Sequence, residues 1–203
     1  MRTSLLLLTT LLILPVARPV ACAEERAPAK AAFAGGCFWC MQPAFEALDG
    51  VTSVTAGYTG GTKQNPTYEE VSEGGTGHAE SIEVVYDPTK ISYDKLLDVF
   101  WHNVDPTDAR GQFCDHGNQY RTAIFYSDDT QKRLAEASKQ AIAKSLKVPG
   151  PIVTEIVPAR QFWPAEEYHQ DYSKKNPVRY RFYRFTCGRD KRLAEVWGAA
   201  PAH

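Results

Sequence analysis

A double glycine between two apolar runs constrains the fold of this chain more than any other feature. Residues 31–34 are all apolar, and all except Phe33 are small. Gly35-Gly36 follow, and an amphipathic run over 41–48 ends at Asp49-Gly50. Glycines allow the backbone to turn sharply where side chains would clash. The segment therefore predicts a strand, a tight turn, and a helix with Cys37 at or near its first turn.

The position of Cys37 favours a reactive thiol. A helix start presents unpaired backbone N–H groups and the positive end of the helix dipole, which stabilise an anion. We therefore expect a lowered thiol pKa, and the thiolate is the nucleophilic form. Phe38 and Trp39 follow directly and would supply an apolar pocket beside the sulfur. A buried structural cysteine near a turn would give the same local pattern, so this stretch alone leaves both interpretations open.

The first 23 residues have the pattern of a secretory signal. Met1-Arg2 is a short basic start, residues 5–14 are mostly apolar, and Ala21-Cys22-Ala23 is a small-residue site. We expect cleavage after Ala23 and export, to the periplasm, with an N-terminal lead over 24–29 and one domain over 30–203 that holds the site and the C-terminal tail. Cys22 leaves one alternative, a lipoprotein anchored at that residue.

Composition and charge exclude several classes of protein. The chain has 203 residues, of which 43% are hydrophobic, enough for one sizeable core. The formal net charge of −1 lacks the basic footprint of a nucleic-acid-binding protein. Without residues 1–23 the charge is −3, because that segment contains two arginines and no acids. We expect no nucleic-acid partner and, after signal removal, no membrane association.

The order of elements predicts an α+β fold. Alternation and helical spacing indicate strands over 30–34, 51–58, 78–86, 120–126 and 152–157, and helices over 37–48, 92–101 and 128–147. The first six elements follow the split β-α-β order of ferredoxin-like cores. We expect a two-layer sandwich with that core and an irregular C-terminal extension, because residues 176–185 lack clear periodicity. A long polar loop, 107–119, is typical of functional segments.

Eight short motifs then run in order across residues 33–190. They are GGCFWC, GYTGG, NPTYEEV, TGHAE, YDP, CDHGNQYR, PAEEYHQDY and CGRD. With these motifs the chain resembles the peptide methionine sulfoxide reductase A family. The resemblance implies an α+β enzyme that reduces the S epimer of methionine sulfoxide, in proteins and as the free amino acid, and so repairs oxidised proteins. It also implies no bound cofactor and a thioredoxin-like protein or dithiol as electron donor.

The same resemblance assigns roles to individual residues. Cys37 would attack the sulfoxide sulfur, and Glu80 would donate a proton to the departing oxygen. Such an acid must be protonated near neutral pH, which requires a partly desolvated site. Tyr68 and Tyr120 would be phenolic hydrogen-bond donors, and Asp115 would be the carboxylate that orients substrate or water. Phe38 and Trp39 would form the wall around the substrate methyl group. The supporting residues would be His78, His116 and Gln119.

Three thiols are available to resolve the sulfenic acid that attack would leave on Cys37. Cys187 is our first choice, because its C-terminal stretch resembles the resolving region of many family members. Cys40 forms a C-x-x-C pair with Cys37 and is an alternative. Cys114 would be a relay or a bystander. Four cysteines in the exported chain are too few for a disulfide framework, which favours a redox-active set.

Two other interpretations of the cysteines are weaker. A C-x-x-C pair in an exported protein also suits a thioredoxin-like disulfide oxidoreductase. Cys37, Cys40, Cys114 and His116 have ligand types that suit a zinc site. Neither interpretation accounts for the full set of motifs, so we expect no metal. We expect a monomer whose partners are oxidised proteins or peptides, free methionine sulfoxide and the thioredoxin-like reductant.

Overall fold

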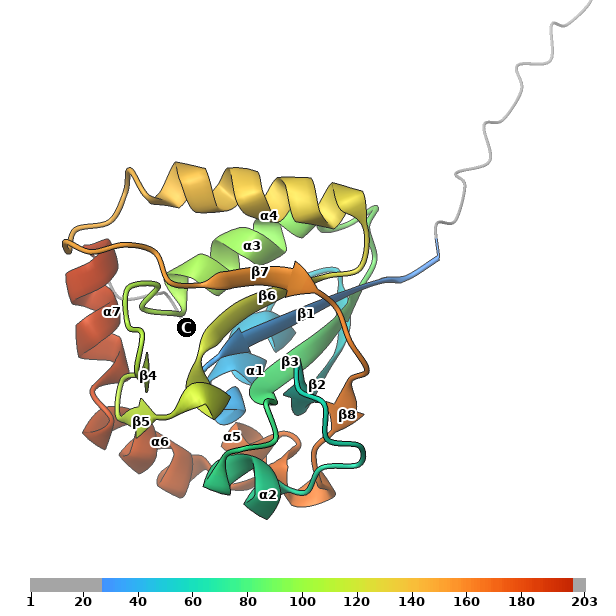
Figure 1. The fold of residues 1–203 in the computed structure, drawn as a ribbon, viewed down its shortest axis with the longest axis vertical. Helices are drawn as coiled ribbons and strands as arrows, with labels where there is room; N and C mark the ends of the chain where they lie inside the picture. The colour runs from blue at the N-terminus through green and yellow to red at the C-terminus, as the bar shows by residue number, and fades with distance from the viewer. Residues whose placement is uncertain (1–26, 199–203) are drawn as a thin grey trace, which may run out of the picture.

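The computed structural model describes residues 27–198, and its centre is a six-stranded mixed sheet (Figure 1). The strands are β1 (Ala29–Gly35), β2 (Val51–Thr59), β3 (Ala79–Tyr86), β6 (Thr122–Tyr126), β7 (Glu155–Pro158) and β8 (Trp163–Pro164). Their order across the sheet is β7-β6-β1-β3-β2-β8. The β6–β7 pair is parallel and every other pair in this sheet is antiparallel. The central strand β1 therefore leads directly into the double glycine.

The main core forms where α1 (Phe38–Glu46) and α3 (Tyr93–His102) cover one face of this sheet. Phe33 of β1 is fully buried, and its ring lies 5.3 Å from the rings of both Phe45 and Phe100. Because strand side chains alternate between faces, Ala34 points to a second, smaller cluster with Phe125. A third helix, α4 (Asp129–Ile142), packs against α3 and β6.

The remaining elements are short or lie toward the C-terminus. They are α2 (Tyr68–Glu73), β4 (Gly111–Gln112), β5 (Asp115–His116), the 3₁₀ turns η1 (Asn118–Tyr120) and η2 (Glu167–His169), α5 (Tyr172–Lys175), α6 (Pro177–Thr186) and α7 (Arg189–Trp197). In Figure 1, α6 lies next to β5 and α7 lies beside β4. The C-terminal helices therefore approach the loop that connects α3 to β6.

The α+β class and the predicted order of strands and main helices are confirmed. The expected irregular C-terminal extension is wrong, because residues 172–197 form three helices. The sequence of α6 hides its period, since aromatic and arginine side chains occupy both its inner and outer faces: Arg184 is buried, whereas Phe182 and Phe185 are exposed. The predicted strand over 120–126 begins later, at Thr122, because Tyr120 belongs to η1.

Within residues 27–198, no helix is both long enough and apolar enough to cross a bilayer. The expected signal segment, its cleavage site after Ala23 and the alternative anchor Cys22 all lie outside the described residues.

Candidate active site

Close packing leaves no room for a side chain at either Gly35 or Gly36. A Cβ atom on Gly35 would lie 2.6 Å from Sδ of Met41, and one on Gly36 would lie 2.6 Å from Cβ of Gln112. Gly36 also has a φ of +77°, a conformation that L side chains rarely adopt. The turn delivers Cys37 to the N-cap position of α1, as the sequence predicts.

Cys37 and Cys40 form a buried pair of free thiols at the start of α1. The Cys40 N–H donates to the Cys37 carbonyl oxygen at 3.1 Å, and the two side chains share a hydrogen bond. Burial, followed by that hydrogen bond, raises the pKa of Cys37. The same bond lowers the pKa of Cys40 to about 6, and the charge of Arg189 also lowers it. The expected lowering of the Cys37 pKa is therefore wrong, because burial outweighs the effect of the helix start on this thiol.

Glu80 reaches the same helix start from β3. Its Oε2 accepts a hydrogen bond from the Phe38 N–H at 3.1 Å, and only 2% of the residue is exposed. Burial raises the pKa of Glu80 to about 8, although the Phe38 N–H lowers it in part. A carboxyl group of this kind keeps its proton at neutral pH and can donate it.

Tyr68 and Tyr120 approach the site from α2 and η1. Burial, followed by the charge of Glu80, raises the pKa of Tyr68 to about 12. The same two causes raise the pKa of Tyr120. Both phenols also interact electrostatically with Cys37. They therefore remain protonated hydrogen-bond donors in the vicinity of the thiol.

Asp115 lies on β5, and its charge acts on Cys37 and Glu80. Burial raises its pKa, while a hydrogen bond from the Tyr183 hydroxyl to its Oδ2 opposes that rise. Tyr183 is on α6 and was not predicted as a site residue. Its only signal in the sequence is its position four residues before Cys187. On a helix, that spacing places both side chains on the same side, so a helix prediction for this segment would have placed Tyr183 on the side of Cys187.

A buried thiol, a protonated carboxyl group and two neutral phenols thus lie together near the start of α1. Comparison with known proteins assigns the chain to a family. The family model described as "Peptide methionine sulfoxide reductase" matches residues 29–201. This chain belongs to the peptide methionine sulfoxide reductase family. A reductase of this name from Bacillus subtilis (strain 168) is 53% identical over 169 residues, which cover 83% of this chain and 96% of that protein.

Solved structures of methionine sulfoxide reductases have the same fold. Reduced Mxr1 from Saccharomyces cerevisiae is 32% identical, with a TM-score of 0.70 over 74% of this chain and 87% of that one. Methionine sulfoxide reductase A of Corynebacterium diphtheriae is 34% identical, with a TM-score of 0.68 over 76% and 78% of the two chains. The chain is thus a thiol-dependent oxidoreductase that acts on methionine sulfoxide.

The aromatic residues that follow the reductase cysteine have different surroundings. Trp39 is partly buried, and its ring stacks on Tyr172 with centroids 3.7 Å apart. Phe38 is 1% exposed and packs against Tyr58 within the main core. Trp39 can therefore face a substrate, while the backbone N–H of Phe38 holds Glu80.

Sequence analysis missed the segment that supports these rings. His169 is 1% exposed, and its Nδ1 accepts a hydrogen bond from the Trp39 indole N–H at 3.0 Å. Glu166 accepts from the Tyr58 hydroxyl at 2.8 Å and from the Tyr68 N–H at 2.9 Å. Both lie in the motif PAEEYHQDY, which carried the family resemblance without assigned roles. They position the aromatic wall and one of the phenols.

Cys114 and Cys187 form a disulfide with a Cα–Cα distance of 4.9 Å. Cys114 is exposed, and Cys187 is partly exposed at the end of α6. The alternative zinc set is not assembled, because the Cys114 sulfur is bonded to Cys187. In residues 27–198, the one group with suitable ligand spacing is Cys114, Asp115 and Cys187, and two of these form the disulfide. The structure thus separates the four cysteines into an inner dithiol and an outer disulfide.

The supporting residues act through loops. His78 Nδ1 accepts from the Gly61 N–H at 3.2 Å, and its Nε2 lies 2.7 Å from the Lys63 carbonyl oxygen. Gln119 donates to the Ser72 carbonyl oxygen at 2.8 Å, whereas His116 is exposed on β5. The His78 contacts join the loops on either side of α2, and the Gln119 contact joins η1 to the last turn of α2.

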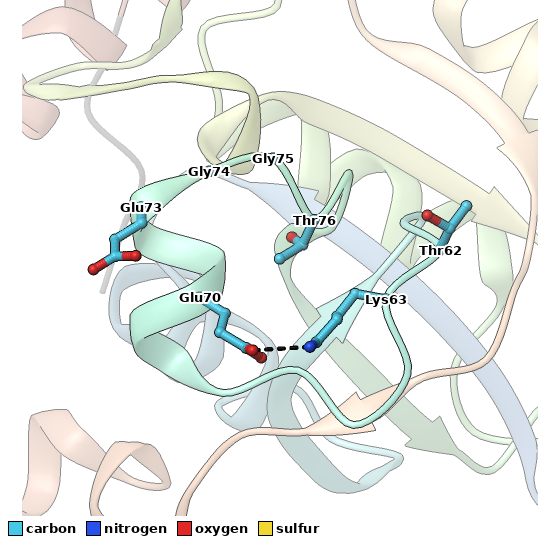
Figure 2. Close-up of a pocket in the computed structure, with 7 residues that line it drawn as sticks. All are labelled: Thr62, Lys63, Glu70, Glu73, Gly74, Gly75 and Thr76. Carbon is cyan, nitrogen blue, oxygen red and sulfur yellow. Dashed lines mark ion pairs between the residues drawn. The ribbon is translucent and has the colours of Figure 1, made fainter.

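A surface hollow lies between α2 and the loops that precede and follow it (Figure 2). It measures about 440 Å³ and is lined by Thr62, Lys63, Glu70, Glu73, Gly74, Gly75 and Thr76. Lys63 and Glu70 face each other across it in an ion pair of 2.9 Å. None of the proposed catalytic residues lines this hollow, so it is separate from the reductase site.

Proposed function

We propose that the chain reduces the S epimer of methionine sulfoxide, free and in proteins, through attack by Cys37 on the sulfoxide sulfur. The observation that carries this proposal is the hydrogen bond that Glu80 accepts from the Phe38 N–H, the first backbone N–H of α1. That bond holds a proton donor beside the helix position occupied by the nucleophile. The epimer follows from the family resemblance.

The first step moves an oxygen atom and two electrons. As Cys37 attacks, the Cys40 thiolate accepts its proton, and Glu80 donates a proton to the sulfoxide oxygen. The sulfur–oxygen bond of the substrate breaks, and the oxygen remains on Cys37 as a sulfenic acid. Methionine leaves as the reduced thioether. The thiol is thus oxidised by two electrons as the sulfoxide is reduced by two.

The remaining site residues stabilise and position the substrate in this scheme. Tyr68 and Tyr120 donate hydrogen bonds to the sulfoxide oxygen as negative charge develops on it. Asp115 orients the substrate or a water molecule, and Trp39 contacts the methyl group with Phe38 behind it. Burial of the site strengthens each of these electrostatic interactions.

Resolution of the sulfenic acid passes to the outer cysteines. The Cys187 thiol attacks the sulfenic sulfur of Cys37, a disulfide forms, and water leaves. The Cys114 thiol then attacks Cys187, which frees Cys37 and produces the Cys114–Cys187 disulfide. The disulfide seen in the structure supports this assignment, because a Cys114–Cys187 bond with free Cys37 and Cys40 is the state that follows the last of these reaction steps. Condensation of Cys37 with Cys40 is the alternative first step.

A thioredoxin-like protein completes the cycle by reducing the outer disulfide. The yeast relative Mxr1 has been solved in complex with Trx2, which supports a partner of this class. We further propose that the chain is exported to the periplasm after cleavage at Ala23 and acts there as a monomer. The family match begins at residue 29, which leaves the signal-like segment outside it.

We also propose that residues 30–203 form one catalytic domain built on a split β-α-β core. The order β6-β1-β3-β2, with α1 after β1 and α3 after β3, supports this classification. In this arrangement Cys37 and Glu80 come from the ends of two neighbouring strands.

A stereospecific assay tests the proposed function. The enzyme is given dithiothreitol and either the S or the R epimer of free methionine sulfoxide, with Cys37→Ser as the control. We expect turnover of the S epimer alone and none by the control. Turnover of the R epimer at a comparable rate, or full activity of the control, would overturn the proposal.

A further inference from the structure

Arg189, the first residue of α7, is a buried cation whose hydrogen-bond acceptors are all neutral. Only 2% of the residue is exposed. Its guanidinium donates to the Asn103 carbonyl oxygen at 2.6 Å, the Gly35 carbonyl oxygen at 3.3 Å and the Met41 thioether sulfur at 3.1 Å. Within residues 27–198, none of its acceptors is a carboxylate, and its Nε has no acceptor at all. A guanidinium keeps its proton in proteins, so an anion close to this side chain would be strongly stabilised.

Two arginines act on the Cys40 thiol, and they differ in their partners. After the hydrogen bond from Cys37, which is the largest cause, the charges of Arg189 and then of Arg184 lower the pKa of Cys40 against the effect of burial. Arg184 pairs with Asp190 through its Nε at 3.0 Å, which neutralises much of its charge. The other titratable groups that act on the inner thiols are Glu80, Asp115 and Tyr183. Arg189 therefore supplies the larger favourable charge for a thiolate at this position.

On the inner side, Arg189 lies against the segment that carries the two free thiols. Its Gly35 contact is two residues before Cys37, and its Met41 contact directly follows Cys40. A Cβ atom on Gly36 would lie 3.9 Å from Nη1 of Arg189. The guanidinium thus touches the chain both before Cys37 and after Cys40.

On the outer side, the same guanidinium lies over the ring of Phe113, 4.5 Å from its centroid. Phe113 directly precedes Cys114 and has a φ of +59°, which L side chains rarely adopt. Cys187 comes two residues before Arg189 in the chain. Because two residues span at most about 7 Å, Cys187 stays close to Arg189 whichever cysteine it is bonded to. One buried cation therefore lies next to the segments of both cysteine pairs.

We propose that Arg189 is a positioning residue that stabilises the thiolate of the inner pair and thereby shifts the disulfide from Cys37 to the Cys114–Cys187 bond. This inference rests on the proposed function, in which oxidation begins on Cys37. Stabilising the reduced form of a thiol pair makes its disulfide a stronger oxidant. A disulfide that includes Cys37 is therefore displaced by the outer thiols, in agreement with the free inner thiols and the outer disulfide of the structure.

The transfer is one thiol–disulfide exchange followed by one proton transfer. The exposed Cys114 releases its proton to solvent, and its thiolate attacks Cys187 in the Cys37–Cys187 disulfide. The bond to Cys37 breaks, the Cys114–Cys187 bond forms, and Cys37 leaves as a thiolate. Cys37 then takes the proton of the Cys40 thiol, so that the negative charge is held on Cys40 near Arg189. Cys114 is oxidised and Cys37 is reduced, while Cys187 is in a disulfide before and after.

The test maps the disulfide in full chains that carry one. Reduced wild type, Arg189→Met and Arg189→Lys each receive one equivalent of methionine S-sulfoxide, and parallel samples receive one equivalent of diamide. After equilibration the thiols are alkylated and the disulfides are mapped by peptide mass spectrometry. Loss of a nearby opposite charge shifts a pKa by about one unit or more, so Arg189→Met should lower the ratio of Cys114–Cys187 to disulfides of Cys37 at least about tenfold. An unchanged ratio would overturn the proposal.

Matched variants separate the charge of Arg189 from its packing. Arg189→Lys keeps a cation without the planar fork, and its ratio should stay within about threefold of the wild type. A lysine variant that behaves like Arg189→Met would assign the residue to packing alone and overturn the proposal. Lys191→Met removes an exposed charge from the same helix and should leave the ratio unchanged. An equal shift in that variant would attribute the effect to net charge and also overturn the proposal.

A thiolate titration decides the case in which Arg189→Met does not fold. The ultraviolet absorbance of the reduced wild type should show a thiolate with a pKa of about 6 that is absent from Cys40→Ser. Wild type without a thiolate between pH 6 and pH 8 would contradict the proposal. Where Arg189→Met folds, the midpoint should rise by about one unit or more, which loss of packing alone would not produce.

The two oxidants separate this inference from the proposed function. Wild type that forms no methionine from the S-sulfoxide would overturn the proposed function, while the diamide samples would still report the disulfide ratio. Chains that form one methionine each, with the same ratio in wild type and Arg189→Met, would support the proposed function and overturn the role of Arg189.

Discussion

The inner and outer cysteine pairs differ in almost every physical respect. Cys37 and Cys40 lie three residues apart on one helix start and are buried, whereas Cys114 and Cys187 lie 73 residues apart, on a loop and at the end of α6. The inner pair carries free thiols, and the outer pair is oxidised. Reaction with a sulfoxide benefits from a dry site with fixed donors, while reduction by another protein needs access. The enzyme meets both needs because the buried thiols and the accessible disulfide lie in separate regions of the molecule.

Asp115 and Arg189 connect the two regions. Asp115 follows Cys114 directly, accepts from Tyr183 of α6, and acts electrostatically on Cys37. Arg189 donates to the carbonyl oxygens of Gly35 and Asn103, and its guanidinium stacks over Phe113 at 4.5 Å. Changes at the outer pair are therefore coupled to the start of α1 by direct contacts.

The largest expected effect comes from removing the inner nucleophile. Cys37→Ser should lower turnover by at least about 10³-fold, because a hydroxyl is a far weaker nucleophile in this setting. Steady-state assay with dithiothreitol measures this. Cys40→Ser is the matched variant and should lose less activity, since it removes the proposed acceptor of the Cys37 proton but keeps the nucleophile. Equal losses in both variants would show that the inner pair acts as one unit.

Glu80→Gln should slow the single-turnover rate by about 10²- to 10³-fold with little change in substrate binding. In the wild type, this rate should be highest between the pKa of Cys40, about 6, and that of Glu80, about 8, because the scheme needs both the Cys40 thiolate and the protonated Glu80 carboxyl group. Rapid-quench measurements from pH 5 to 10 would check it. A wild-type rate that continues to rise above pH 9 would exclude Glu80 as the proton donor.

The same carboxyl group affects stability with a defined sign. Its folded-state pKa of about 8 exceeds the reference value of 4.5. Between these values the unfolded chain loses the proton that the folded chain keeps, so stability falls as pH rises, by up to about 1.4 kcal/mol per pH unit. Glu80→Gln should remove this decline. Urea unfolding at pH 5 and pH 8 would measure it, and an equal decline in both proteins would contradict the assignment.

At the outer pair the effect should be smaller and specific to recycling. Cys187→Ser should preserve one round of reduction, while multiple turnover with thioredoxin falls by about ten- to a hundredfold. Quantifying methionine formed per enzyme in one round and at steady state separates the two. Cys114→Ser is the control and should stop the cycle after the Cys37–Cys187 disulfide has formed. Normal recycling of Cys187→Ser would transfer the resolving role to Cys40.

The smallest effect should come from the support of the aromatic wall. His169→Phe keeps a buried ring but removes the acceptor for the Trp39 indole N–H. Loss of one such hydrogen bond costs about 1 kcal/mol, so kcat/KM should fall about fivefold, mainly through KM. Steady-state kinetics with free methionine sulfoxide would show this. An equal fall with kcat alone would mean that His169 acts on the chemical step.

The inner region was largely predictable from sequence, and the outer region was not. The double glycine, the strand before it and the amphipathic helix after it are local signals, and they located Cys37 correctly. The pKa of that thiol could not be predicted, because burial depends on elements such as β3 that are distant in the chain. The Cys114–Cys187 pairing and the Tyr183–Asp115 contact likewise join segments about 70 residues apart. The period of α6 was masked because its inner face binds the active site while its outer face is apolar.

The outer disulfide has a topological consequence. It closes a covalent ring that contains β6, α4, β7 and most of the C-terminal helices, with a sequence separation of 73 residues. Closing a ring of this size restricts the unfolded chain and stabilises the folded state by about 3–5 kcal/mol in the loop-entropy model. The proposed catalytic cycle opens and closes this ring at every turnover. Without reductant, the enzyme would therefore accumulate in its disulfide-bonded form, which is the form more resistant to unfolding. Depletion of the electron donor would thus stabilise the folded enzyme until the donor is available again.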